Sequence, residues 1–269
     1  MGNKINEPYV GELVKEKLRE KYEEDLNHAI KLYKNSGKIT KELFDICSIF
    51  EDKYKNTHLD CDDIYVKMID LYDMVANKEI PEKIPSEFTN QYSSFSFSIL
   101  REHFIKIQGY PFVTKDWIKE LAKLLRGKKV LEVMCGLGTI SYALKNEGID
   151  IIATDDISWK ETWKNAYNHY CEIEELDAIE AIDKYGKDID YIIMSWPPYE
   201  DPIAYKVLQK MREVNKDAAI IYLGEGYGGC TADNLFHYRA NIIENDIIDS
   251  VNSIYKPWPT IHDSFSLVK

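Results

Sequence analysis

The stretch from residue 130 to residue 156, VLEVMCGLGTISYALKNEGIDIIATDD, constrains the fold of this chain more than any other part. In order it predicts a short apolar strand (129–133), a tight glycine turn (135–138), a helix (about 139–146) and a second strand that ends in two aspartates. Strands that alternate with helices build parallel sheets from βαβ units. The stretch therefore predicts half of a βαβ unit of the kind that binds nucleotides.

The glycines and the aspartates of this stretch suggest the kind of ligand. Gly136 and Gly138 let the backbone leave a strand sharply and approach a ligand closely, while the following helix presents its unsatisfied N–H groups toward that ligand. Asp155 and Asp156 close the second strand about twenty residues further on, where a carboxylate can accept hydrogen bonds from a ribose diol. We therefore expect a ligand that contains a nucleoside.

The segment E-V-M-C-G-L-G, which begins at Glu132, resembles the first motif of class I S-adenosylmethionine-dependent methyltransferases. The resemblance implies that Glu132 lies near the amino group of the cofactor, and that Gly136 and Gly138 lie under its methionine and ribose portion. Met134 stands where the family usually has Gly or Ala. We expect Met134 and Cys135 to line the cofactor site together with the glycines.

The same resemblance assigns roles to acids at the ends of the second and third strands. Asp156 lies in an Asp-Ile-Ser context that is common in the family, so it is the expected ribose ligand, with Asp155 as the second choice. Asp177 falls where the third strand of the family ends, and is expected to bind the adenine amino group with Ala178 beside the ring. A helix-capping aspartate is the alternative for Asp177.

A nicotinamide or flavin site is the alternative for the glycine turn itself. The dinucleotide fingerprint needs a third Gly or Ala, and Ser141 stands at that position. Because no pyrophosphate fingerprint is complete, we rank this alternative below S-adenosylmethionine.

A second informative stretch, residues 189–199, reads IDYIIMSWPPY. An apolar strand over residues 191–194 runs into two prolines, which cannot continue a hydrogen-bond ladder. The chain must therefore leave the sheet at its carboxyl edge, where open α/β sheets bind ligands. The segment resembles the fourth motif of amino-group methyltransferases, in which Asp, Asn or Ser precedes Pro-Pro and an aromatic residue. A purely structural Pro-Pro turn is the alternative.

By position, this second resemblance implies that the carbonyl of Pro197 accepts an N–H bond of the methyl acceptor and that the ring of Tyr199 stacks on it. Trp196 occupies the place of the Asp or Asn, and its side chain cannot accept a hydrogen bond. Either the register differs and Ser195 contacts the substrate, or the acceptor is not a flat exocyclic amine. These four residues are the candidates for the catalytic turn, and Ser195 is also a candidate cofactor contact.

A glycine-rich loop, GEGYGGC over residues 224–230, follows the next predicted strand and lies over the same edge. Glu225 is a candidate to bind a cationic substrate or to take its proton, and Tyr227 a candidate to close over it. The alternative is a wide turn whose glycines only permit positive φ. His262 is a second, less favoured candidate base.

The order of these elements predicts an α/β fold. We expect a three-layer Rossmann-like methyltransferase core over residues 89–269, with a mostly parallel seven-stranded sheet whose last strand is antiparallel. Apolar residues at three- and four-residue steps predict helices over residues 1–88, and Pro81 and Pro85 break that pattern. We expect this N-terminal helical subdomain to cap the site.

Composition narrows the function classes. The 269 residues carry a formal net charge of -12, which disfavours nucleic-acid binding because a phosphate backbone needs a clustered basic surface. The five cysteines form no C-x-x-C pair, so we expect neither a disulfide framework nor a metal site. No apolar run approaches membrane-spanning length. We expect a cytoplasmic protein with no membrane contact.

The sequence therefore predicts transfer of a methyl group from S-adenosylmethionine to a nitrogen of a small molecule or peptide. One alternative is a nucleic-acid adenine-N6 methyltransferase, which the Pro-Pro-Tyr segment favours and the acidic charge disfavours. The other is a non-catalytic partner protein that binds S-adenosylmethionine, which Trp196 suggests.

Overall fold

The computed structural model describes residues 31, 71–72, 74–84, 101, 104–161, 169–258 and 261–269. The chain divides into two compact units, residues 1–70 with 94–96 and residues 71–93 with 97–269. Apart from Lys31, every described residue belongs to the second unit. The helices predicted before residue 71 lie outside the described residues, so the N-terminal cap stays a prediction.

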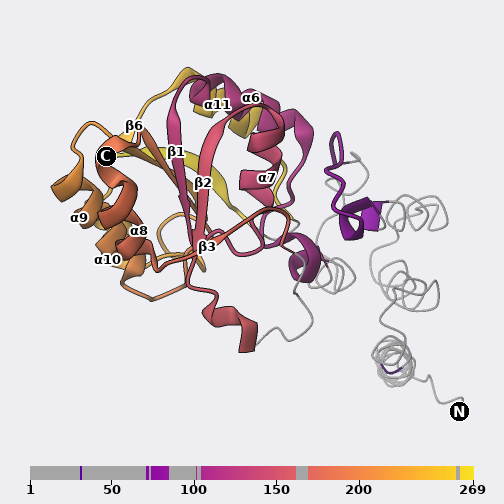
Figure 1. The fold of residues 1–269 in the computed structure, drawn as a ribbon, viewed down its shortest axis with the longest axis horizontal. Helices are drawn as coiled ribbons and strands as arrows, with labels where there is room; N and C mark the ends of the chain where they lie inside the picture. The colour runs from indigo at the N-terminus through magenta and orange to yellow at the C-terminus, as the bar shows by residue number, and fades with distance from the viewer. Residues whose placement is uncertain are drawn as a thin grey trace, which may run out of the picture. The chain divides into compact units, whose positions relative to one another are not determined.

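The second unit is built on a seven-stranded sheet with the order β3-β2-β1-β4-β5-β7-β6 (Figure 1). β1 to β5 run parallel, and β7 pairs antiparallel with β5 and with β6. The strands are Lys129–Val133 (β1), Asp150–Asp155 (β2), Glu174–Glu175 (β3), Tyr191–Ser195 (β4), Ala219–Gly224 (β5), Ile242–Ile243 (β6) and Ser264–Val268 (β7). The predicted α/β fold, mostly parallel with an antiparallel last strand, is confirmed.

Helices cover both faces of this sheet (Figure 1). One apolar core lies under α6, α7 and α11, and a second lies under α8, α9 and α10. The helices are Lys115–Leu125 (α6), Thr139–Asn146 (α7), Ala178–Tyr185 (α8), Ile203–Val214 (α9), Asn234–Arg239 (α10) and Asp246–Ile254 (α11), with short 3-10 turns at Ser158–Glu161 (η1) and Gly186–Asp188 (η2). None of the described helices combines the length and the apolar character that a bilayer span requires.

The central strands are mostly apolar because helices cover them on both sides, and the buried Glu132 is the charged exception in β1. All six residues of β5 are buried, as are the last four of β1. This double burial explains why these segments are largely apolar in the sequence, without the alternation of a half-exposed strand.

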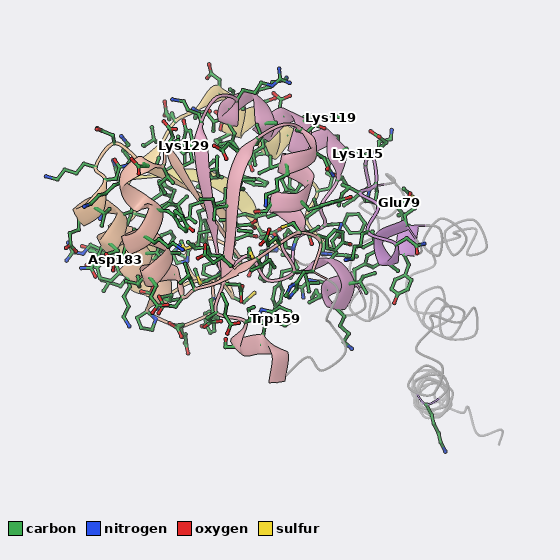
Figure 2. All side chains as sticks on the ribbon, in the orientation of Figure 1. Glu79, Lys115, Lys119, Lys129, Trp159 and Asp183 are labelled. Carbon is green, nitrogen blue, oxygen red and sulfur yellow. The ribbon has the colours of Figure 1, made fainter. Side chains whose placement is uncertain are left out.

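The carboxyl ends of the parallel strands meet at one edge of the sheet. β1 and β4 are paired with Val133 opposite Met194, so the turns that follow them leave the sheet side by side. Figure 2 shows Lys129, at the start of β1, and Trp159, just after β2, at opposite ends of the strands. The turns at the Trp159 end carry the predicted site residues.

Candidate active site

A cavity of about 770 Å³ opens at the carboxyl ends of β1, β2 and β4. Its volume falls in the range of about 300–1,000 Å³ that is usual for ligand sites. The predicted site residues that line it are Glu132, Met134, Cys135, Gly136, Asp155, Asp156, Asp177, Ala178, Ser195, Trp196, Pro197 and Tyr199. Gly138, Glu225 and Tyr227 are not among its lining residues.

The turn after β1 needs positive φ at three of its positions. Gly136 and Gly138 have φ of 57° and 72°, and Met134 has φ of 55°. A methionine at positive φ is uncommon and costs free energy. A Gly in place of Met134 would adopt this φ without that cost. Gly138 serves packing: an added Cβ would lie 2.9 Å from Cys171 Sγ. The turn thus has one glycine that faces the cavity and one that allows close packing beneath it.

Glu132 is 2% exposed and joins β1 to the first turn of α7. Its Oε2 accepts hydrogen bonds from the backbone N–H of Ser141, at 3.0 Å, and from the Ser141 hydroxyl. Burial raises the pKa of Glu132 to about 7, and the bonds from Ser141 oppose that rise only in part. Its Oε1 has no hydrogen-bond partner among the described residues, so one acceptor oxygen of this cavity residue is free for a ligand.

Asp155 and Asp156 have different roles although they are adjacent. Asp155 is 4% exposed; its Oδ2 accepts the Gly136 N–H at 2.7 Å, and its Oδ1 accepts from Ile157 N and Trp159 Nε1 at 2.7 and 2.9 Å. Burial raises the pKa of Asp155. Both of its oxygens therefore hold the glycine turn and the end of β2 together.

Asp156 is exposed, and its Oδ1 accepts the Ser158 N–H at 2.9 Å. Its Oδ2 makes no hydrogen bond with any described residue, and the side chain lines the cavity. Of the two aspartates, Asp156 is the one with an oxygen available to a ligand. This favours Asp156 as the ribose ligand, which stays a prediction.

Asp177 caps α8, as the structural alternative proposed. Its Oδ1 accepts from the backbone N–H groups of Ile179 and Glu180 at 2.8 and 2.9 Å, and Glu180 completes a capping box. Asp177 and Ala178 also line the cavity. The cap and the cofactor contact are compatible, because the cap uses only one of the two carboxylate oxygens.

The turn after β4 is held by backbone bonds to the neighbouring segments. Trp196 has φ of 51°, and its N–H donates to the carbonyl of Leu223 at 2.8 Å. The Pro197 carbonyl accepts the N–H of Ala232 at 3.1 Å, so only its second lone pair is left for a substrate. The Ser195 hydroxyl is buried with no hydrogen-bond partner in the described part of the chain, whereas Tyr199 is 57% exposed.

The Trp196 ring is fixed by residues that the sequence patterns did not mark. It stacks on Tyr110 with a centroid distance of 5.1 Å and an interplanar angle of 7°, and the Arg101 guanidinium carbon lies 5.1 Å from its centroid. Its Nε1 donates to Asp263 Oδ2 at 2.7 Å, and Tyr255 donates to the same oxygen at 2.8 Å. Position 196, which holds a hydrogen-bond acceptor in the family motif, thus holds the indole N–H donor of Trp196 here. Asp263 accepts the hydrogen bond from that N–H.

Glu225 does not face the cavity, contrary to the expected substrate contact. It is 8% exposed; its Oε2 accepts from Cys230 N at 2.8 Å and its Oε1 from His262 N at 2.9 Å. Although burial alone would raise the pKa of Glu225, these hydrogen bonds hold it below the usual value. Its carboxylate closes the loop by accepting hydrogen bonds from these two backbone N–H groups.

Tyr227, at the tip of the same loop, is 76% exposed and also lies outside the cavity. Cys230 is the loop residue that does line it. Among the described residues, no group of three or more His, Cys, Asp or Glu side chains is placed to hold a metal ion.

The strand order and the antiparallel β7 define the class I methyltransferase fold. No family model and no curated protein sequence matches this chain. Similar solved structures include a SAM-dependent methyltransferase from Anabaena variabilis ATCC 29413, with 12% identity over 70% of this chain and 99% of that chain and a TM-score of 0.37. The fold assignment rests on the strand order of this chain itself.

Two further similar structures contain the cofactor or its product. The Pyrococcus abyssi tRNA (uracil-54, C5)-methyltransferase with S-adenosyl-L-homocysteine has 16% identity over 56% of this chain and 37% of that chain, with a TM-score of 0.36. The magnesium protoporphyrin IX methyltransferase from Synechocystis PCC 6803 with bound SAM has 12% identity over 58% of this chain and 79% of that chain, with a TM-score of 0.34. This chain thus covers well under two thirds of the length of the Pyrococcus abyssi protein.

Proposed function

We propose that the cavity binds S-adenosylmethionine and that the protein transfers the methyl group of this cofactor to a nitrogen of a small molecule or peptide in the cytoplasm. The observation that carries the proposal is that the glycine turn after β1 and the Ser195 to Tyr199 turn after β4 line one cavity. A cofactor held by the first turn would then present its methyl group to an acceptor held by the second. When bound, S-adenosylmethionine supplies an electrophilic methyl group on a sulfonium.

The polar groups over β1, β2 and β3 suit the donors of this cofactor. Four acidic side chains line that half of the cavity, namely Glu132, Asp155, Asp156 and Asp177. Ribose hydroxyls, an adenine amino group and an ammonium group all donate hydrogen bonds, whereas a pyrophosphate would be repelled by these acids. An added Cβ at Gly136 would have no atom within 4 Å, so the turn leaves open space on this side. These features favour S-adenosylmethionine over a dinucleotide.

The turn after β4 would orient the acceptor. An amine is a poor nucleophile until it is held in line with the breaking bond, so positioning supplies much of the rate. The Ser195 hydroxyl has no hydrogen-bond partner in the described part of the chain and can accept an N–H bond; the second lone pair of the Pro197 carbonyl can accept another. We propose these two groups, with the half-exposed ring of Tyr199, as the acceptor contacts.

The cofactor is tested by calorimetry with S-adenosylmethionine on wild-type protein, Asp156→Asn and the control Asp150→Asn. Asp150 is exposed at the opposite end of β2, so its substitution makes the same charge change away from the cavity. Loss of a charge-assisted hydrogen bond, worth about 1.5–3 kcal/mol, should weaken binding about tenfold or more in Asp156→Asn. The control should bind like the wild type. A wild-type protein that does not bind S-adenosylmethionine would refute the proposal.

The acceptor class is tested by transfer of label from methyl-labelled S-adenosylmethionine into separated small-molecule, protein and RNA fractions. Label in small molecules or peptides is the expected result. Label in RNA, with binding that falls steeply with salt, would support the adenine-N6 alternative that Pro-Pro-Tyr suggests. Cofactor binding with no label in any fraction would support the non-catalytic alternative.

A further inference from the structure

The one basic side chain among the described lining residues is Arg101. Its guanidinium carbon lies 5.1 Å from the ring centroid of Trp196 and 5.9 Å from that of Tyr110. Its Nε is buried with no hydrogen-bond partner, and the guanidinium forms no ion pair with any described residue. Contact with two aromatic rings offsets only part of the cost of removing a cation from water. Arg101 is therefore a cavity-lining cation that lacks an anion among the residues that the structure describes.

Asp263 is a described carboxylate close to Arg101, and one of its two oxygens is already hydrogen-bonded. Asp263 is close enough for Arg101 to influence it electrostatically, yet the two side chains form no ion pair. The Oδ2 of Asp263 accepts from Trp196 and from Tyr255, and its Oδ1 is buried without a partner. Asp263 thus holds Trp196 in place and forms no ion pair with Arg101.

Two other lining side chains also carry buried polar atoms without partners. Gln108 is 2% exposed; its Nε2 donates to the Val113 carbonyl at 2.9 Å, while its Oε1 has no partner in the described part of the chain. The Ser195 hydroxyl is likewise buried and has no hydrogen-bond partner among the described residues. Buried polar groups in native proteins are almost always hydrogen-bonded. Three unpartnered groups around one cavity therefore indicate a polar ligand.

The charges of the cavity are divided between its two halves. Four of the five lining acids lie on β1, at the end of β2 and at the start of α8, on the side assigned to the cofactor. The fifth, Asp201, follows β4, and its Oδ1 accepts the Ile203 N–H at 2.9 Å. Arg101 contacts Trp196, which follows β4, on the side assigned to the acceptor. An anionic group would find its only basic partner among the described lining residues on the acceptor side.

Building on the proposed function, we propose that the methyl acceptor carries a carboxylate or phosphate group that pairs with Arg101. Guanidinium binds either oxyanion through paired N–H donors, and its stacked position on Trp196 orients those donors. The aromatic rings of Trp196, Tyr110 and Tyr199 line the same region and suit an acceptor with an apolar body. Specificity for such an acceptor thus comes from one cation among aromatic side chains.

The probes that test this proposal are two aromatic anions, 4-aminobenzoate and phenyl phosphate, and the neutral isostere 4-aminobenzamide. They are titrated by calorimetry into the full-length protein with and without S-adenosylhomocysteine. In the wild type we expect at least one anion to bind about tenfold more tightly than the amide, the size of one charge-assisted pair. The two anions separate a carboxylate site from a phosphate site.

The variant Arg101→Gln should abolish this preference, and Arg101→Lys should keep part of it. The matched control is Lys106→Gln, which removes the same charge from an exposed side chain that does not line the cavity. Equal binding of anion and amide in the wild type, no binding of either anion, or an unchanged preference in Arg101→Gln would overturn the proposal. Thermal melting shows whether each variant is folded, and Arg101→Lys serves as the test if Arg101→Gln does not fold.

The carboxylate of the cofactor is the competing anion for Arg101. S-adenosylmethionine should bind Arg101→Gln as it binds the wild type. Weaker cofactor binding in this variant would assign Arg101 to the methionine carboxylate and overturn the acceptor proposal. If the wild type does not bind S-adenosylmethionine, the proposed function fails, whereas titration of the anions without S-adenosylhomocysteine still tests the anion site separately.

Discussion

Trp196 donates the N–H of its indole to Oδ2 of Asp263, at 2.7 Å, across 67 positions of the sequence. The bond joins the turn after β4 to the segment just before β7, and Tyr255 donates to the same oxygen. A tryptophan in place of an acid or amide therefore does not leave the turn without polar contacts. In place of a side chain that could accept a hydrogen bond from the substrate, the turn has an indole ring that Asp263 holds at the wall of the cavity.

We expect Trp196→Phe and Asp263→Ala to be energetically coupled. Each removes the bond between these two side chains, so the double variant should lose less stability than the sum of the single losses. The difference should be about 1.5–3 kcal/mol in urea unfolding, the net value of a hydrogen bond to a charged group. As a control, Trp196→Phe combined with Asp183→Asn on the exposed side of α8 should be additive (Figure 2). Additive losses in the first pair would contradict the proposed coupling.

Glu132 should make the stability of the fold depend on pH. Its pKa is raised from 4.5 to about 7 in the folded state, so between these values the folded protein holds a proton that the unfolded chain has released. Stability from this group is therefore full at low pH and is lost as the pH rises through about 7. The neutral variant Glu132→Gln should gain stability relative to the wild type across this interval.

The measurement is the free energy of unfolding of both proteins in urea at a series of pH values. Glu175→Gln, an exposed substitution on β3, serves as the control and should follow the wild type. A constant difference between Glu132→Gln and wild type across the series would rule out the linkage.

The two glycines of the turn after β1 should respond differently to alanine. Both have positive φ, which costs a residue with a side chain about 1–3 kcal/mol. At Gly138 the added methyl would also meet Cys171 and Ile173 at 2.9 and 3.2 Å, whereas at Gly136 it meets nothing. Gly138→Ala should therefore lower the melting temperature more than Gly136→Ala does. Because Gly136 lines the cavity, its variant should weaken binding of S-adenosylmethionine while the fold persists; the reverse order of the two melting temperatures would contradict the packing argument.

Glu225 should matter for the loop and not for the cofactor. Glu225→Ala leaves the N–H groups of Cys230 and His262 without an acceptor, at a cost of about 1–3 kcal/mol. Hydrogen exchange at these two amides should accelerate, while calorimetry with S-adenosylmethionine should give the wild-type affinity. Tyr227→Ala, on the exposed tip of the same loop, should change neither quantity. Unchanged exchange in Glu225→Ala would show that the carboxylate does not hold the loop.

Local sequence was sufficient to predict the sheet and many of the residues that line the cavity at the ends of β1 and β2. The glycine turn, the apolar strands beside it and the aspartates at strand ends are features whose structural meaning depends on neighbours a few residues away. A turn that needs positive φ selects glycine, and a strand buried on both faces selects an unbroken apolar run. For this reason Gly136, Asp156 and Asp177 were placed at the cavity before any contact was known.

Contacts between distant segments decided the remainder. From the sequence, Glu225 was expected to contact the substrate because it lies in a glycine-rich loop. In the fold its carboxylate accepts a hydrogen bond from the N–H of His262, 37 positions away. The sequence showed that Trp196 cannot accept a hydrogen bond, but it did not show that Trp196 donates one to Asp263. No sequence motif marked Arg101, which contacts the Trp196 ring. The sequence alone determined the α/β class and the edge of the sheet where the turns meet, because those follow from local backbone preferences. Only the tertiary structure decided that Glu225 lies outside the cavity and that Asp263 and Arg101 contact Trp196, because burial and hydrogen bonding depend on which distant groups the fold brings together.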